Sequence, residues 1–516
     1  MDNFLNHRYL FIGIIAALFL EVASFIQFFI PNIGTIIGII LIIIFVYLSY
    51  YHYYSAIFLL IVELSLSGHG HMLHLPVYSY PVAMRHIWFV LVIIFFIFHY
   101  RENIKEIYTR YSKFTSVVLG LTFLVIFSQI LGYVAGNNLI DIFFDSNAYA
   151  FLLLLFPLLA LPNKYIPKLI NIFFGALVIL SIKTLITLYI FSHNLFIDDA
   201  WYFWIRDLRF GEVTSIGYKF FRIFLQSHIL LVPALFLLLA RVIKRYKNGI
   251  VFGKGEEAVL TILGILFTST LIISFSRSFI LALSISFLFF LIIMFHKKEI
   301  NSKSVIKSII VSLAIIIVSI STVFHILDNP LSGELLLDRF SLEGDAAIDS
   351  RWALLAQMKE TIKEQPIFGK GFGTSLTYNS EDPRIIEQTG GTYTTFAFEW
   401  GWLDIWIKLG VVGLFLFGLL FYRMFIEAKK IYHDSYDIYS IVIIPLLIFI
   451  AIAHFFTPYI NHPLGLFFIF LIIMFIKRGV SLQYQGNHSE NLESSEAFSP
   501  QAEDSKSRSL HFWFLR

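Results

Sequence analysis

Long, uninterrupted runs of apolar residues, separated by short polar stretches, make up most of the chain. The runs are rich in Ile, Leu and Phe and do not alternate residue by residue, which favours helices over the strands of a membrane barrel. Many of them approach the roughly 17–25 residues that a membrane-spanning helix needs. They lie near 9–29, 34–50, 53–66, 86–100, 115–135, 148–161, 169–191, 223–240, 257–275, 279–295, 306–325, 403–421, 438–456 and 462–476. The pattern predicts an all-α polytopic membrane bundle of about 12–14 spans, in which 53–66 and 148–161 are short enough to be re-entrant.

The composition supports a membrane protein and excludes several other classes. Of 516 residues, 58% are hydrophobic and only 14% are charged, whereas soluble domains carry about 25% charged residues. The net charge of +3 gives no reason to expect a nucleic-acid partner. The chain has no cysteine, so disulfide and thiolate chemistry are excluded. The first twenty residues lack a small-residue cleavage site, so we expect a first span there and not a removed signal peptide.

Basic residues are concentrated in one set of short loops, at 101–113, 241–255, 296–307, 422–430 and 477–478. With fourteen spans all of these loops fall on the same side as both termini. Loops rich in Lys and Arg remain in the cytoplasm, so that side is expected to be cytoplasmic.

The opposite side carries two larger loops, at about 193–222 and 326–402. We therefore expect four regions. They are an N-terminal membrane bundle of about 11 spans (1–325), a long extracytoplasmic loop with short amphipathic helices (326–402), C-terminal spans (403–479), and a disordered cytoplasmic tail rich in Ser, Glu and Gln (480–516).

The long loop has an organised middle, because "DSRWALLAQMKETIKEQP" (349–366) has the pattern of an amphipathic helix. Asp349 or Ser350 could cap it, and Pro366 follows its end. In this interpretation Arg351 lies in the first turn, where free N–H groups and the helix dipole favour a bound phosphate. The predicted apolar face consists of Trp352, Leu354, Leu355, Met358 and Ile362.

The glycine-rich stretch "GKGFGT" (369–374) follows this helix. No strand precedes it and no GK[ST] pattern follows, so a nucleotide-binding loop is not indicated. We expect a turn with close backbone packing.

Several charged residues lie at or within the apolar runs. Arg277, in "IISFSRSFILALSISF", is either an interfacial arginine that reaches the headgroups or a fixed cation for an anionic ligand. Arginine suits phosphate because its planar fork donates two hydrogen bonds and stays charged. Arg209 and Arg222 are further candidates among the charges of the first outer loop. Functional intramembrane charges and structural ion pairs are both open for Glu21, Glu63 and Lys183.

Three histidines in "GHGHMLH", His69, His71 and His74, have a spacing that could bind a metal. They have no acidic partner nearby, and we expect no metal site there.

Three motifs occur in a characteristic order: "SFSRSFILAL", "DSRWALLAQMKETIKEQPIFGKGFGTS" and "WLDIWIKLGVVGLFLF". Over about residues 205–425 the chain resembles the O-antigen ligase and O-antigen polymerase family, bacterial integral membrane glycosyltransferases. The family pattern has a Ser-Arg pair that opens a span, an arginine near a tryptophan, a PxxGxGxG turn, and a segment with two glycines leading into a span. These correspond to Ser276-Arg277, Arg351-Trp352, 366–373, and Gly410 with Gly413.

One position departs from the family pattern. Counting back from Gly410 places the family's histidine at Glu399 and its asparagine at Trp400. A glutamate can also accept a proton as a general base, although a carboxylate is ionised at neutral pH unless burial raises its pKa. Glu399 is thus either the catalytic base or a structural partner of the arginines, and Asp404 is the second candidate for the base.

The resemblance implies an enzyme of the bacterial inner membrane whose site faces the periplasm. The donor would be an undecaprenyl-pyrophosphate-linked glycan and the acceptor another lipid-linked oligosaccharide or lipid A-core. Arg277 and Arg351 would hold the pyrophosphate, assisted by Arg209 or Arg222, while Glu399 deprotonates the attacking hydroxyl. No nucleotide sugar, metal or other cofactor is required by this scheme.

Three alternatives remain open from the sequence. We favour a polymerase over an O-antigen ligase, because the glutamate departs from the histidine associated with ligases. A transporter or flippase of lipid-linked glycans belongs to another class, and it would be expected to show paired halves or broken helices at mid-membrane. A non-catalytic envelope scaffold is the third alternative.

Overall fold

Helices form most of the regular structure in the computed structural model, which describes residues 5–77, 80–217, 219–248, 254–296, 302–327, 346–380, 383–434 and 438–492. Within these ranges eleven helical segments are long and apolar enough to cross a membrane. They are α1 (His7–Phe29), α2 (Pro31–Tyr51), α6 (Ser112–Val134), a segment built from α7 (Leu139–Ser146), η1 (Asn147–Leu154) and α8 (Leu155–Ala160), α9 (Ile166–Ser192) with η2 (Asn163–Tyr165), α11 (Leu231–Asn248) with η3 (Gln226–Leu230), α12 (Lys254–Ser274), α13 (Arg277–His296), α14 (Ser302–Leu327), α18 (Gly401–Asp434) and α20 (Pro463–Leu492).

Three further apolar segments complete the bundle. The helices α4 (Met84–Tyr100) and α5 (Ile104–Arg110) are bent by 101° relative to each other, and only together are they long and apolar enough to cross a membrane. Two helices are shorter, α3 (Tyr53–Leu66) and α19 (Ile438–Phe456). A helix therefore lies at each of the fourteen predicted positions, and the predicted helical membrane bundle is confirmed.

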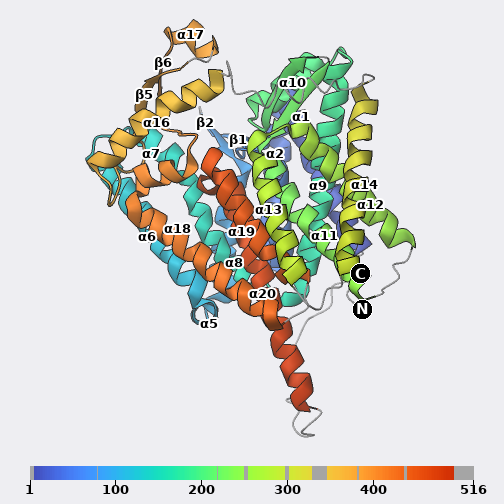
Figure 1. Ribbon diagram of the computed structural model, residues 1–516. Coiled ribbons are helices and arrows are strands. Elements are labelled where there is room, and N and C mark those ends of the chain that lie inside the picture. Colours follow the sequence, from blue (N-terminus) through green and yellow to red (C-terminus); the bar gives the residue numbers. More distant parts are fainter. Residues whose placement is uncertain are drawn as a thin grey trace.

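The two ends of the bundle carry different kinds of structure (Figure 1). At the upper end of the view lie α10 (Asp198–Asp207), α16 (Ala346–Glu364) and α17 (Pro383–Thr389). At the lower end lie α5, within the basic segment 101–113, and the last turns of α20. This separation agrees with the predicted division between long polar loops on one side and basic loops on the other.

Parts of several predicted segments lie outside the described residues, namely parts of the basic loops 241–255 and 296–307, of the loop 326–402 and of the tail 480–516. The helix α20 continues past residue 480 to Leu492, so the first part of the predicted tail is helical.

Three antiparallel hairpins were not predicted: β1 (His74–Val77) with β2 (Tyr80–Ala83), β3 (Gly211–Gly217) with β4 (Phe220–Leu225), and β5 (Leu376–Asn379) with β6 (Thr392–Thr395). In β4 the side chains of Phe220, Ile223 and Leu225 are buried. One available signal was Gly217, which lies at the turn between the two strands and has a left-handed φ of 111°. The hairpin β3–β4 places Arg222 opposite Thr214.

The charges predicted within the apolar runs form buried pairs. Lys183 of α9 donates to Glu21 of α1 at 2.6 Å, and Arg85 of α4 donates to Glu63 of α3 at 2.7 Å. A buried charge is tolerated where an opposite charge is its neighbour. Glu21, Glu63 and Lys183 thus join neighbouring helices.

Candidate active site

The glycine-rich turn 366–373 fits into a break in α18. At Gly410 the backbone leaves the helical region, with φ 68°. There Val411 donates its N–H to the carbonyl of Pro366 at 2.9 Å. A Cβ on Gly410 would lie 2.0 Å from the carbonyl oxygen of Ile367, so only glycine fits this position.

The other side of the same turn packs on α6. Phe372 donates its N–H to the carbonyl of Ser128 at 3.2 Å, and Asn137 donates to the carbonyl of Phe372 at 2.8 Å. A Cβ on Gly371 would lie 2.3 Å from the nitrogen of Gly132. The predicted turn with close backbone packing is confirmed, and it fixes the position of α16, which precedes it in the chain.

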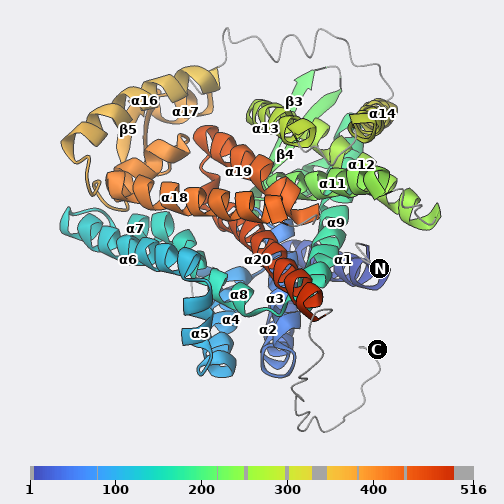
Figure 2. The same cartoon turned by 60° about the horizontal axis from the view of Figure 1, so that its bottom comes forward.

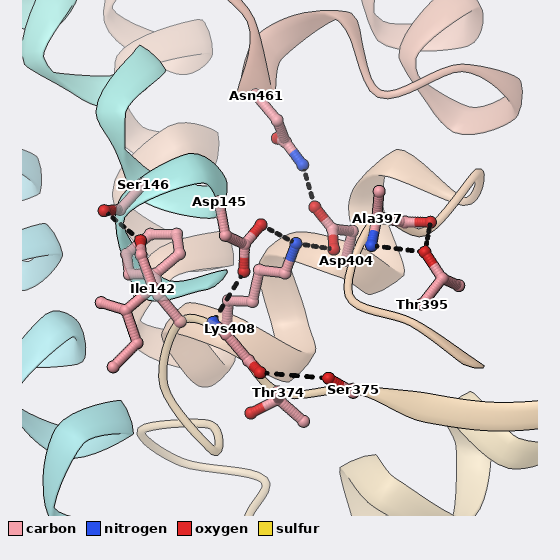
Figure 3. A network of polar contacts seen from close by, with 12 residues as sticks. Ile142, Asp145, Ser146, Thr374, Ser375, Thr395, Ala397, Asp404, Lys408 and Asn461 are labelled. Carbon is pink, nitrogen blue, oxygen red and sulfur yellow. Dashed lines mark hydrogen bonds and ion pairs between the residues drawn. The ribbon is translucent and has the colours of Figure 1, made fainter. Parts of the chain in front are cut away.

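A buried ionic network lies beneath this turn (Figure 3). Lys408 of α18 pairs with Asp404 at 2.5 Å and also with Asp145 of α7. Asp145 accepts the N–H of Gly373 at 2.9 Å, and Asn461 donates to the second oxygen of Asp404. The side chains of Lys408, Asp404 and Asp145 are almost completely buried. Asp404 is thus bound to a cation and an amide, which favours a structural role over its alternative role as a base.

The helix α16 packs on the start of α18 through a narrow apolar stripe. Leu354, Met358 and Ile362 are buried against Phe398 and Ile407. Three members of the predicted apolar face thus face the span bundle, whereas Trp352 does not. Trp352 is 59% exposed, because two residues of helix turn it about 200° away from Leu354.

The predicted start of α16 was wrong. It runs from Ala346, so neither Asp349 nor Ser350 is its first residue. Arg351 lies in the second turn, beyond the four N–H groups that a helix start leaves free. The side chain of Arg351, and not the start of the helix, is therefore the feature that could bind an anion here.

Arg351 and Glu399 form an ion pair. The Arg351 Nε donates to the Glu399 Oε2, and their side chains are 39% and 54% exposed. The Trp400 indole donates to the Arg351 carbonyl at 3.1 Å, and Phe398 is buried. The neighbours on both sides of Glu399 thus anchor its backbone, while its carboxylate remains accessible to solvent.

Arg222 and Arg277 lie at the junction of α12 and α13. Arg222 donates to the Ser274 carbonyl at the end of α12 at 3.3 Å and lies 3.5 Å from a carboxylate oxygen of Glu212. Arg277 is the first residue of α13.

Burial, more than any other cause, lowers the pKa of Arg222, and the charges of Arg277 and Arg351 lower it further. Glu212 and Tyr459 act in the opposite direction. The charges of Arg277 and Arg351 thus act on Arg222 from two other elements, and a bound anion would relieve this repulsion.

The turn between α19 and α20, residues 457–462, connects the region of Arg222 and Arg277 with the region of Trp400. Its Tyr459 ring lies 5.8 Å from Phe279 of α13 and interacts with Arg222. The Trp400 ring lies 6.4 Å from that of Phe456, which precedes the turn. The helix α19 lies between α13 and α18 in both overall views (Figures 1 and 2). Sequence reasoning missed this turn, although "HFFTPYINHP" places polar and aromatic residues in a short loop on the side of the long loops.

Arg209 lies elsewhere, beside the histidines of the 67–74 segment. It has a left-handed φ of 53°, and its carbonyl accepts the N–H of His69 at 3.4 Å. It is not among the charges that act on Arg222. The structure therefore brings together Arg222, Arg277 and Arg351 and leaves Arg209 in a separate cluster.

His69 and His74, two of the three histidines whose spacing could bind a metal, contact different glutamines. The Gln226 amide contacts the His69 Nε2 at 2.5 Å, and the His74 backbone N–H donates to the side-chain oxygen Oε1 of Gln27 at 3.1 Å. Among the described residues, no three His, Asp or Glu side chains are grouped so that they could hold a metal ion.

Part of the chain that carries these residues is similar to a known protein family. Residues 262–418 match the model of the family described as O-antigen ligase (Wzy_C), a span from within α12 through Arg277, α16 and the glycine-rich turn into α18. No curated protein matches the chain. Over these residues, which make up less than half of the chain, the protein is similar to the O-antigen ligase (Wzy_C) family.

Proposed function

We propose that the protein transfers a glycan from an undecaprenyl-pyrophosphate carrier to a hydroxyl of an acceptor sugar, and that it polymerises O-antigen or another surface polysaccharide. The observation that carries the proposal is the Arg351–Glu399 pair. In this pair Arg351 would bind the leaving pyrophosphate and Glu399 would deprotonate the nucleophile. Both residues lie within the segment that matches the O-antigen ligase family model.

The arginines would bind the pyrophosphate of the donor. Arg222, Arg277 and Arg351 come from β4, α13 and α16, so they could surround an anion from different directions. An arginine donates two parallel hydrogen bonds to a phosphate and stays charged at any physiological pH. Bonds of this kind strengthen as negative charge builds on the departing pyrophosphate, and therefore stabilise the transition state.

Glu399 would accept the proton of the attacking hydroxyl. The hydroxyl oxygen forms a bond to the anomeric carbon, and the bond from that carbon to the pyrophosphate oxygen breaks. The electron pair of the broken bond leaves with the pyrophosphate, and the hydroxyl proton passes to the carboxylate.

The ion pair gives this scheme an order of events. Without substrate, Arg351 occupies the Glu399 carboxylate. A pyrophosphate, with more negative charge and more acceptor oxygens, would compete for Arg351 and release Glu399. The base would thus become available only when the donor is bound.

The proposed orientation puts both termini in the cytoplasm and the site on the periplasmic face of the inner membrane. This orientation is supported by the tendency of loops rich in Lys and Arg to remain in the cytoplasm. The basic segment 101–113, which contains α5, lies at the end of the bundle opposite α16. Undecaprenyl-linked glycans would approach from the surrounding lipid.

The test uses purified protein in detergent with an undecaprenyl-pyrophosphate-linked oligosaccharide. A polymerase lengthens this glycan and releases undecaprenyl pyrophosphate. An O-antigen ligase does so only when lipid A-core is added as acceptor. Failure to join glycans with either acceptor would contradict the proposal and favour a transporter, which has no membrane to act across in detergent.

A further inference from the structure

A second polar cluster shares the turn 457–462 with the arginine site and has no part in the scheme above. Its members are His69 between α3 and β1, Gln226 at the start of η3, and His462 just before α20. The Gln226 amide contacts the His69 Nε2 at 2.5 Å, and the rings of His69 and His462 meet edge to face at 5.1 Å. The side chain of His69 is exposed, although its neighbours Gly68 and Gly70 are buried.

Hydrogen-bond partners assign the protons of both rings. The Gln226 amide donates to the His69 Nε2, so the His69 proton is on Nδ1. The Leu464 backbone N–H donates to the His462 Nδ1 at 3.3 Å, so the His462 proton is on Nε2. Each ring thus has one N–H group that can donate to a ligand.

Both imidazoles are neutral at physiological pH. Desolvation by the surrounding protein is the main cause that lowers the pKa of His69 to about 4, although part of its side chain stays exposed, and the charges of Arg209, His71 and Arg85 add to it. Burial also lowers the pKa of His462 well below its ordinary value, with His69, Arg85 and His86 contributing. The cluster therefore offers uncharged donors and acceptors together with flat rings, which is a chemistry suited to sugar hydroxyls and less suited to an anion.

The position of the cluster relates it to the arginines. Tyr459 interacts with Arg222, and His462 follows three residues later, after the 3₁₀ turn η4. The turn therefore connects the cluster to the residue that interacts with Arg222.

We propose that His69, Gln226 and His462 form a subsite that binds a sugar ring of the glycan substrates, next to the pyrophosphate held by the arginines. The inference rests on the proposed function, because it names the group bound beside the reacting carbon. The sugar could belong to the acceptor or to the donor, and the experiment separates the two.

The test compares His69→Ala and Gln226→Ala with the wild type in initial-rate measurements, varying donor and acceptor separately. Loss of a neutral hydrogen bond is expected to raise one KM by about three- to tenfold. A higher KM for the acceptor places the sugar on the acceptor, and a higher KM for the donor places it on the donor. Affinity for sugar-free undecaprenyl pyrophosphate should not change. His52→Ala, an exposed histidine between α2 and α3, is the matched control.

A measurement without turnover separates this inference from the proposed function. Saturation-transfer NMR with the oligosaccharide cleaved from its lipid reports binding directly. If the wild type binds it and His69→Ala does not, the subsite stands even where no transfer occurs. Unchanged KM values and unchanged oligosaccharide binding in both variants would overturn the subsite, as would a loss of affinity for sugar-free undecaprenyl pyrophosphate.

Discussion

Arg351 and Glu399, 48 residues apart in the chain, form an ion pair between α16 and the residues that lead into α18. Both side chains are partly exposed. Exposed pairs of this kind contribute about 0–1 kcal/mol to stability, so breaking the pair costs the fold little. The fold is held instead by the buried stripe of α16 and by the docked glycine turn. The pair can therefore exchange partners during a reaction without disturbing its support.

Replacement of the arginines by lysine should weaken donor binding. In Arg351→Lys and Arg222→Lys the charge is kept but the planar fork is lost, so we expect the affinity for undecaprenyl pyrophosphate to fall about tenfold. Equilibrium binding to the purified variants measures this. Arg206→Lys, in the exposed part of α10, is the control and should bind as the wild type does. Equal affinity in all three variants would contradict the pyrophosphate assignment.

Two glycines of α18 should respond oppositely to alanine. Gly410→Ala would place a Cβ 2.0 Å from the Ile367 carbonyl at a φ of 68°, and the left-handed backbone strain alone costs about 1–3 kcal/mol. Gly418 has nothing within 4 Å of the same position, and alanine there should stabilise the helix by about 0.5–1 kcal/mol. Thermal unfolding in detergent compares them. A Gly410→Ala protein as stable as the wild type would disprove the docking of the turn.

The buried network should affect stability more than chemistry. Lys408→Met leaves Asp145 and Asp404 without their cation, and loss of one partner of a buried ion pair typically costs about 3–5 kcal/mol. Asp404→Asn should lower the unfolding temperature but keep transfer activity per folded molecule within about tenfold, since it removes no proton acceptor from the reaction. A stable Asp404→Asn protein without activity would instead make Asp404 the base.

Acid should destabilise the protein through His69 and His71, whose pKa values are lowered in the folded protein. The pKa of His69 is about 4 in the folded protein and near 6.5 in the unfolded chain, so between these values the unfolded chain binds more protons. The contribution of His69 to stability is complete above about pH 6.5 and is lost as the pH falls towards 4. His71 has the same shift.

Unfolding temperatures at pH 7 and pH 5 test this. The difference between them should be smaller in His69→Asn than in the wild type, because asparagine keeps a polar group but does not titrate. An equal difference in the two proteins would contradict the shift.

Much of the fold follows from periodicity alone. The apolar runs predict the spans because a run of that length has few other stable environments, and the three glycines of 366–373 predict a close backbone approach. The start of α16 was misplaced, because Asp349 and Ser350 are good caps by residue type but the helix begins at Ala346. The strand β4 was read partly as a loop and partly as a span, since Arg222 interrupts its apolar residues.

The candidate site was only partly predictable, for a different reason. Arg277, Arg351 and Glu399 were found through motifs, but the pairing of Arg351 with Glu399 depends on how the loop folds back over α18. The separation of Arg209 from Arg222 depends on the hairpin β3–β4. The turn 457–462 lies between Arg222 and Trp400 because of three-dimensional packing, and no local sequence pattern predicts this position.

The most direct test of the account is the rate of a single turnover of Glu399→Gln with saturating donor and acceptor. The account predicts that this rate falls by about 10²–10⁴, the usual contribution of a general base. Donor affinity should stay the same or rise, because the amide competes less strongly than the carboxylate for Arg351, and the unfolding temperature should stay near that of the wild type. Glu364→Gln is the control: Glu364 is the last residue of α16 and its exposed carboxylate pairs with Lys370, so this variant should turn over at the wild-type rate. A folded Glu399→Gln protein that transfers glycan as fast as the wild type would contradict the central claim.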